Sequence, residues 1–203
     1  MASTQRRILF AGSYARASEA GIHGFSFDDG ARTLTPLGSF AGITNPTFLV
    51  VHPNGRWLYA VGETGQNDGV PGAVWALSLM REPWVLQPIN QQPSGGDSPC
   101  HLHLDATGKW LLVSNYGSGS AGVLPIRPDG SLGEMTDLVQ HRGHGTHPER
   151  QEGPHAHSAT LTPDQRFALV ADLGIDQVVI YRFDTTAGRL APHGQGQARP
   201  GAG

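Results

Sequence analysis

Hydrophobic residues occur along this chain in two patterns: alternation with polar residues, and short uninterrupted runs such as WLYAV and WLLV. Both patterns are typical of β-strands, and the segments end at Gly, Pro, Asn or Asp, which favour turns. The spacing of an amphipathic helix persists nowhere for 10 residues. The pattern therefore predicts an all-β protein.

One strand–turn–strand segment occurs three times, as NPTFLVVHPNGRWLYAVGE (45–63), SPCHLHLDATGKWLLVSNY (98–116) and PHAHSATLTPDQRFALVADL (154–173). A shorter copy, RRILFAGSY, lies near the start. The residues that begin the second strand of each copy are spaced by 49, 53 and 57 residues: Ile8, Trp57, Trp110 and Phe167. A four-stranded unit with a period of about 50 residues is typical of a β-propeller blade.

The second copy predicts four strands, at 47–51, 57–61, 73–79 and 85–91. Turns are predicted at the same offset in each copy, at 53–55, 106–108 and 163–165. A stacked β-solenoid would need shorter coils, and a sandwich would not repeat its turns at one period. We predict one propeller domain over 1–203 with about four blades of antiparallel strands, in units of approximately 1–44, 45–97, 98–153 and 154–203.

The composition narrows the possible partners. The chain is 38% hydrophobic and 15% charged with a formal net charge of −3, which gives no broad attraction to nucleic acid or to an anionic membrane surface. No apolar stretch approaches the roughly 20 residues that span a bilayer. Cys100 is the only cysteine, which excludes an internal disulfide and a cysteine-built zinc cluster. We expect a cytoplasmic protein without a nucleic-acid or membrane partner.

Candidate site residues lie where the repeats begin and end. His155 and His157 open the fourth unit at positions i and i+2, which point to the same side of an extended strand. The innermost strand of a blade lines the central channel of a propeller, so both imidazoles are expected there. Glu63 ends the second unit's WLYAVGE strand and is expected at the rim.

Three further residues occupy related positions. Alternation in the third unit places Cys100 on one side of its strand and His101 on the other, and we predict that His101 faces the channel. Asn115 ends the second strand of the third unit, and Asp172 has the same offset in the fourth. We expect all three predicted residues, His101, Asn115 and Asp172, to bind ligand.

The segment from 140 to 158 holds five histidines: His141, His144, His147, His155 and His157. Neutral imidazole is a common zinc ligand. No cysteine joins them, and histidines three apart in a Gly-rich loop share no fixed face, so we expect no metal. Arg150 could bind a phosphate, although a solvated salt bridge with Glu149 or Glu152 is the simpler expectation.

The repeats resemble the lactonase seven-bladed β-propeller family, which includes the cycloisomerase-2 type of 6-phosphogluconolactonase. The resemblance covers the whole chain, and HPERQEGPHAHS with the following VADLG is its most specific part. It implies that this chain is the N-terminal part of a ring lacking about three blades. A following Arg/His segment of that family would carry part of the phosphate site, so reduced or absent activity is expected of a chain ending here. Open blade edges such as ILFA and VVIY would then favour self-association.

The resemblance implies hydrolysis of a phosphorylated sugar lactone, 6-phosphogluconolactone, to the open acid, in the pentose phosphate pathway and without a cofactor. This chemistry needs a base that activates water and donors for the developing oxyanion. His155 or His157 suits the base, Glu63 would orient a partner, and Asn115 or His101 would donate hydrogen bonds. Two alternatives stay open: a lactonising cycloisomerase acting on a muconate-like acid, and a noncatalytic propeller that binds a ligand or protein.

Overall fold

Four antiparallel β-sheets make up the computed structural model, which describes residues 6–81 and 83–201. The first sheet holds β1 (Arg6–Gly12), β2 (Ala20–Asp28) and β3 (Thr33–Ala41). The second holds β4 (Leu49–Val51), β5 (Trp57–Gly62), β6 (Ala73–Arg81) and β7 (Trp84–Pro93). The third holds β8 (Pro99–Leu104), β9 (Trp110–Asn115), β10 (Ser120–Pro125) and β11 (Asp137–Gln140). The fourth holds β12 (Ala156–Leu161), β13 (Phe167–Asp172), β14 (Gln177–Asp184) and β15 (Arg189–Gln197).

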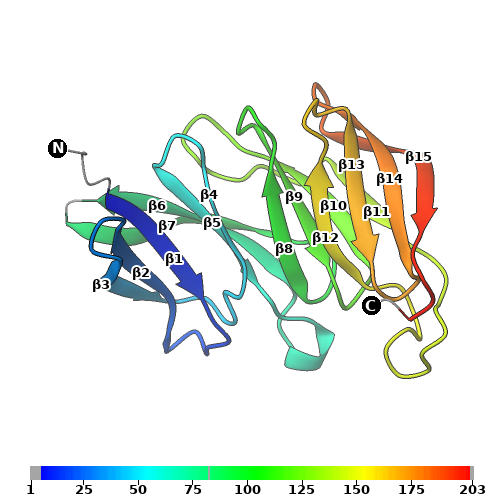
Figure 1. Cartoon of the computed structure of the whole chain (residues 1–203), viewed down its shortest axis with the longest axis horizontal. Coiled ribbons are helices and arrows are strands. Elements are labelled where there is room, and N and C mark those ends of the chain that lie inside the picture. Colours follow the sequence, from blue (N-terminus) through cyan, green and yellow to red (C-terminus); the bar gives the residue numbers. More distant parts are fainter. Residues whose placement is uncertain (1–5, 82, 202–203) are drawn as a thin grey trace.

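The sheets follow one another in chain order, from the N-terminal end at the left of Figure 1 to the C-terminal sheet at the right. In each sheet the strands pair with their neighbours in sequence, as in a propeller blade. The innermost strands β4, β8 and β12 lie against one another, which confirms the predicted architecture. In the first sheet, β1 pairs with β2 in the same way as β5 pairs with β6 in the second sheet. β1 therefore corresponds to the second strand of a four-stranded blade.

The hydrophobic core lies between adjacent sheets. Between the first and second sheets, Ile22 and Leu58 are both fully buried. Tyr59 and Val113 are fully buried between the second and third, and Ala168 and neighbouring residues fill the space between the third and fourth. The continuous apolar second strands are therefore covered on both faces, as their sequence predicted.

At one end of the sheets, the turn before each second strand repeats its hydrogen bonds. His52, Asp105 and Thr162 occupy the same repeat position, and their backbone N–H groups donate to the carbonyls of Trp57, Trp110 and Phe167. Each also accepts at its own carbonyl a bond from the third residue of the turn, which has positive φ: Gly55, Gly108 or Gln165. We call this end the turn end.

The predicted strand bounds need small changes. β4 begins at Leu49 rather than at 47, because the residues before it bond irregularly to the next strand: Val61 N–H donates to Phe48, and Glu63 N–H to Asn45. The helical structure in the described residues is one 3₁₀ turn, Gln66–Asp68. None of the described residues forms a helix long and apolar enough to cross a membrane.

Candidate active site

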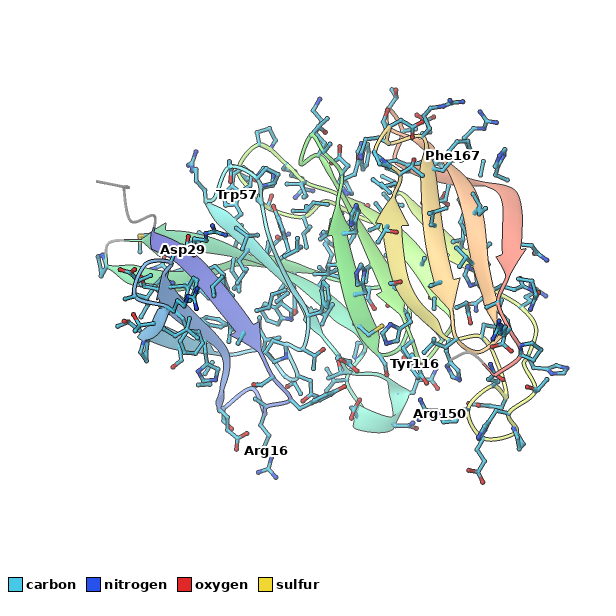
Figure 2. All side chains as sticks on the ribbon, viewed as in Figure 1. Arg16, Asp29, Trp57, Tyr116, Arg150 and Phe167 are labelled. Carbon is cyan, nitrogen blue, oxygen red and sulfur yellow. The ribbon has the colours of Figure 1, made fainter. Side chains whose placement is uncertain are left out.

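A cavity of about 630 Å³ opens at the end of the sheets opposite the turn end. Its lining comes from all four sheets and from the segment before β12: Tyr14, Thr47, Glu63, Cys100, Tyr116, Glu149, Arg150, Glu152, His155, His157 and Leu173. Figure 2 shows Tyr116 and Arg150 at this end, on the lower side of the view, whereas Trp57 and Phe167 lie at the opposite end. We call it the main cavity.

Two repeat positions supply most of the lining. Tyr14, Glu63, Tyr116 and Leu173 each come six residues after the residue that aligns their repeat, which is Ile8, Trp57, Trp110 or Phe167. Thr47, Cys100 and His157 each come ten residues before it. The predicted site included Glu63 and His157 but missed the other members of both sets. Applying the offset of these two residues to every copy would have found them.

A β-bulge directs two members of the second set, Cys100 and His157, toward the main cavity. Pro99 pairs with Asn115 and His101 with Ser114, so Cys100 is the extra residue of the third sheet. The fourth sheet has the same irregularity between Ala156 and Ser158, which makes His157 the extra residue there. A bulge leaves its extra residue outside the ladder and redirects its side chain.

His155 and His157 lie in the same cavity in different surroundings. The His155 ring is mostly buried and stacks on Tyr116, with ring centroids 4.4 Å apart. Its Nδ1 lies 3.0 Å from the Tyr116 carbonyl oxygen, which can only accept, so we assign the proton to Nδ1. His157 is exposed and stands edge-on to Tyr116 at 6.2 Å. One imidazole is thus fixed, whereas solvent reaches the other.

Glu63 is held by two hydroxyl groups. Tyr14 Oη donates to Glu63 Oε1 over 2.9 Å, and Thr47 Oγ1 donates to Oε2. The bond to Glu63, followed by partial burial, raises the pKa of Tyr14, so this phenol stays protonated at neutral pH. The cavity therefore has one carboxylate whose position is fixed by neighbours from two sheets.

The segment between β11 and β12 forms one wall of the main cavity. His155 Nε2 lies 3.4 Å from Glu152 Oε1, and the pKa of Glu152 is lowered by its own backbone N–H and by His155. Arg150 also lines the cavity, yet it forms no ion pair with Glu149 or Glu152 in the described part of the chain. The expected close salt bridge is therefore not formed among these residues, although the charge of Arg150 helps to lower the pKa of Glu152. Arg150 is exposed.

Cys100 brings a thiol to the main cavity. Its Sγ donates to the carbonyl of His157 over 3.4 Å. Burial, followed by the charge of Glu63, raises the pKa of Cys100 to about 12. Because the thiolate is the nucleophile of cysteine chemistry, a thiol held in this state is unsuited to attack an ester.

Three predicted site residues lie outside the lining of the main cavity: His101, Asn115 and Asp172. His101 packs against Phe48 with tilted rings whose centroids are 4.5 Å apart and does not line the cavity, so its predicted position facing the channel is wrong. The physical reason is the bulge at Cys100, which directs the Cys100 side chain, instead of that of His101, toward the cavity. Asn115 is fully buried, and its Nδ2 donates to Ser94 O and to Ser120 Oγ, both over 3.0 Å. Its amide nitrogen is thus bonded within the fold.

Asp172 lies directly behind the cavity wall. Its Oδ1 accepts the backbone N–H of His155 over 2.7 Å and that of Gly174 over 2.9 Å. Its Oδ2 lies 2.6 Å from Nδ1 of the buried His141. Asp172 therefore fixes the backbone at His155. It also binds His141, at the start of the loop between β11 and β12.

The five histidines between 140 and 158 separate in space. His141 is buried against Asp172, His144 is exposed, and His155 and His157 reach the main cavity. The described residues include no group of three or more His, Cys, Asp or Glu side chains that could hold a metal ion.

Comparison with known proteins gives consistent matches. Residues 8–203 match the family described as lactonase, 7-bladed beta-propeller. A 6-phosphogluconolactonase of Bacillus subtilis is 34% identical over 196 residues, which is 97% of this chain and 54% of the relative. One from Formosa agariphila is 28% identical over 180 residues, covering 88% of this chain and 50% of the relative.

A solved structure agrees with these relatives. The periplasmic gluconolactonase of Pseudomonas aeruginosa superposes with a TM-score of 0.88 at 31% identity, over 98% of this chain and 56% of that one. The chain thus spans about half the length of the relatives it matches.

Proposed function

Because the chain belongs to the lactonase family of seven-bladed β-propellers, we propose that its main cavity binds and hydrolyses a sugar lactone, most specifically 6-phosphogluconolactone. The observation that carries this proposal is the convergence of His155, His157 and Glu63 on one cavity. Opening a lactone adds water across an ester bond, so the cavity must remove a proton from water and return one to the ring oxygen.

His157 is the general base of the proposed reaction. It is exposed in the main cavity, so ligand and water reach its ring. Neutral imidazole suits this role because its ordinary pKa lies near neutral pH. In the reaction, water loses its proton to His157 while its oxygen attacks the lactone carbonyl. The ester C–O bond then breaks, and the ring oxygen takes the proton back from protonated His157 and leaves as the hydroxyl of the open acid.

His155 and Glu63 position the ligand. His155 presents Nε2 beside Glu152, because its Nδ1 proton is engaged by the Tyr116 carbonyl. Nε2 therefore carries no proton and can accept a hydrogen bond from a ligand hydroxyl group. Glu63, held by Tyr14 and Thr47, can accept hydrogen bonds from sugar hydroxyl groups. Asp172 and Asn115 act as positioning residues in this scheme, and Arg150 supplies the cation for a phosphate.

The test is a rate measurement on lactone opening. We expect the chain to accelerate hydrolysis of 6-phosphogluconolactone above its spontaneous rate, followed with a pH indicator. His157→Ala should lower kcat/KM by about 100-fold or more, the usual contribution of a general base. The matched control is His193→Ala, which removes a histidine stacked on Phe167 at the turn end and should leave the rate unchanged.

Two outcomes contradict the proposal. An unchanged rate in His157→Ala excludes it as the base. Binding of gluconate or 6-phosphogluconate without hydrolysis identifies a noncatalytic propeller instead. The cytoplasmic location and self-association through blade edges stay predictions, and the similar gluconolactonase of Pseudomonas aeruginosa is described as periplasmic.

A further inference from the structure

A smaller cavity of about 270 Å³ adjoins the main one. Tyr116, Arg150 and Leu173 line both cavities, and His147, Gln151 and Gly201 complete the smaller one. We call it the side cavity. Because the two cavities share three residues, one ligand can reach from the first into the second.

The two cavities differ in charge. Glu63, Glu149 and Glu152 line the main cavity, whereas the described lining of the side cavity has no carboxylate. Arg150 contributes a guanidinium group that forms no ion pair within residues 6–81 and 83–201. Asp176 lies behind the lining and accepts bonds from Gln151 Nε2 over 2.8 Å and from Gly201 N–H over 2.9 Å.

His147 presents a second donor. The backbone N–H of Glu149 donates to His147 Nδ1 over 3.3 Å. A ring nitrogen that accepts carries no proton, so the neutral ring of His147 has its proton on Nε2. This is the opposite tautomer to that of His155, whose Nδ1 donates to Tyr116. His147 thus offers an N–H donor at Nε2 in the side cavity. His155 offers an unprotonated Nε2 in the main cavity.

Gln151 fixes the segment that carries both donors. Its Oε1 accepts the backbone N–H of Thr146 over 2.9 Å and that of His147 over 3.0 Å. Its Nε2 donates to Leu173 O over 2.7 Å and to Asp176 Oδ1. The buried amide therefore uses both donors and both acceptor sites within the fold. The backbone that carries His147 and Arg150 is thus held in place before a ligand binds.

We propose that His147 and Arg150 bind the phosphate group of a phosphorylated sugar lactone whose ring occupies the main cavity. The proposal rests on the function proposed above and adds where the phosphate lies. Guanidinium and imidazole N–H groups both donate to phosphate oxygens, and arginine does so in a bidentate fashion. The three carboxylates of the main cavity would repel a phosphate there, so the charge pattern also orients the ligand.

The test compares a phosphorylated ligand with its unphosphorylated counterpart. Affinities of the chain for 6-phosphogluconate and gluconate are measured by calorimetry. Arg150→Gln and His147→Ala should each weaken 6-phosphogluconate binding by about 10- to 100-fold, the usual effect of losing a hydrogen bond to a charged group, and leave gluconate binding unchanged. Arg150→Lys keeps the charge without the planar fork and should give an intermediate loss.

Matched controls come from the same loop. Arg142→Gln and His144→Ala remove exposed groups that line neither cavity and should change neither affinity. Equal losses for both ligands, or no loss for 6-phosphogluconate, overturn the phosphate assignment. Failure of the chain to bind gluconate counts against the proposed function instead, so the two failures are distinguishable.

Discussion

The two ends of the sheets use the same repeat in different ways. At the turn end, His52, Asp105 and Thr162 share a position and make the same backbone hydrogen bonds. At the cavity end, Glu63 and its counterparts share a position but present a carboxylate, a phenol or an apolar side chain. The repeated chemistry builds the blades, whereas the position whose chemistry varies from sheet to sheet lines the site.

The turn end also joins neighbouring sheets. His52 Nε2 lies 3.1 Å from Gly108 O of the third sheet, and Gln165 Oε1 of the fourth accepts Ala106 N–H over 2.9 Å. Trp110 Nε1 donates to Thr185 O of the fourth sheet over 2.8 Å. Changes at the turn end should therefore affect stability, and changes at the cavity end should affect binding and rate.

Asp105→Ala should have the largest effect on stability. The buried carboxylate accepts the backbone N–H groups of Thr107, Lys109 and Trp110 over 2.7–3.0 Å. Leaving these donors without a charged acceptor should lower the free energy of unfolding by about 3 kcal/mol. Urea denaturation followed by tryptophan fluorescence measures the change, with the exposed Asp164→Ala as control. A loss no larger than in the control would contradict a structural role for the turn end.

His101 should make stability depend on pH. Burial, followed by the charges of His103 and His157, lowers the pKa of His101 from 6.5 to about 4. The unfolded chain binds this proton near pH 6.5, so stability should fall as the pH drops from 6.5 toward 4. Partial exposure of the ring lets solvent screen the charge, which limits the loss to about 1 kcal/mol.

His101→Phe tests that contribution. Phenylalanine retains the ring contact with Phe48 and does not titrate. The variant should lose less stability than the parent between pH 7 and pH 4.5 in parallel urea denaturations. Identical pH dependence in both proteins would show that His101 titrates normally in the fold.

Gln165 should give an effect no larger than that of His101. The φ of Gln165 is 61°, whereas the corresponding turns of the second and third sheets have glycine at this position. That conformation costs a non-glycine residue about 1 kcal/mol. Gln165→Gly relieves this cost but loses the bond to Ala106 N–H. Gln165→Ala loses the bond and keeps the cost. The glycine variant should therefore be about 1 kcal/mol more stable than the alanine variant in thermal unfolding; the reverse order would contradict the turn geometry.

The sequence predicted the fold more fully than the site. The period and the turn residues specify blades because strand pairing and turn chemistry are local properties. Glu63, His155 and His157 were also predicted, since they end or begin strands. His101 was misplaced because strict alternation does not reveal a bulge at Cys100. The roles of Gln151 and Asp172 were hidden because their partners depend on the path of the loop between β11 and β12.

The most direct test of the contrast between the two ends is the lactone hydrolysis rate per folded molecule in His157→Ala and Asp105→Ala, with unfolding measured on the same samples. We expect His157→Ala to lose about 100-fold or more in kcat/KM at unchanged stability. We expect Asp105→Ala to lose stability at unchanged kcat/KM. If His157→Ala retains the parent rate, or if Asp105→Ala loses rate as strongly as His157→Ala does, the cavity end is not the separate site of lactone hydrolysis.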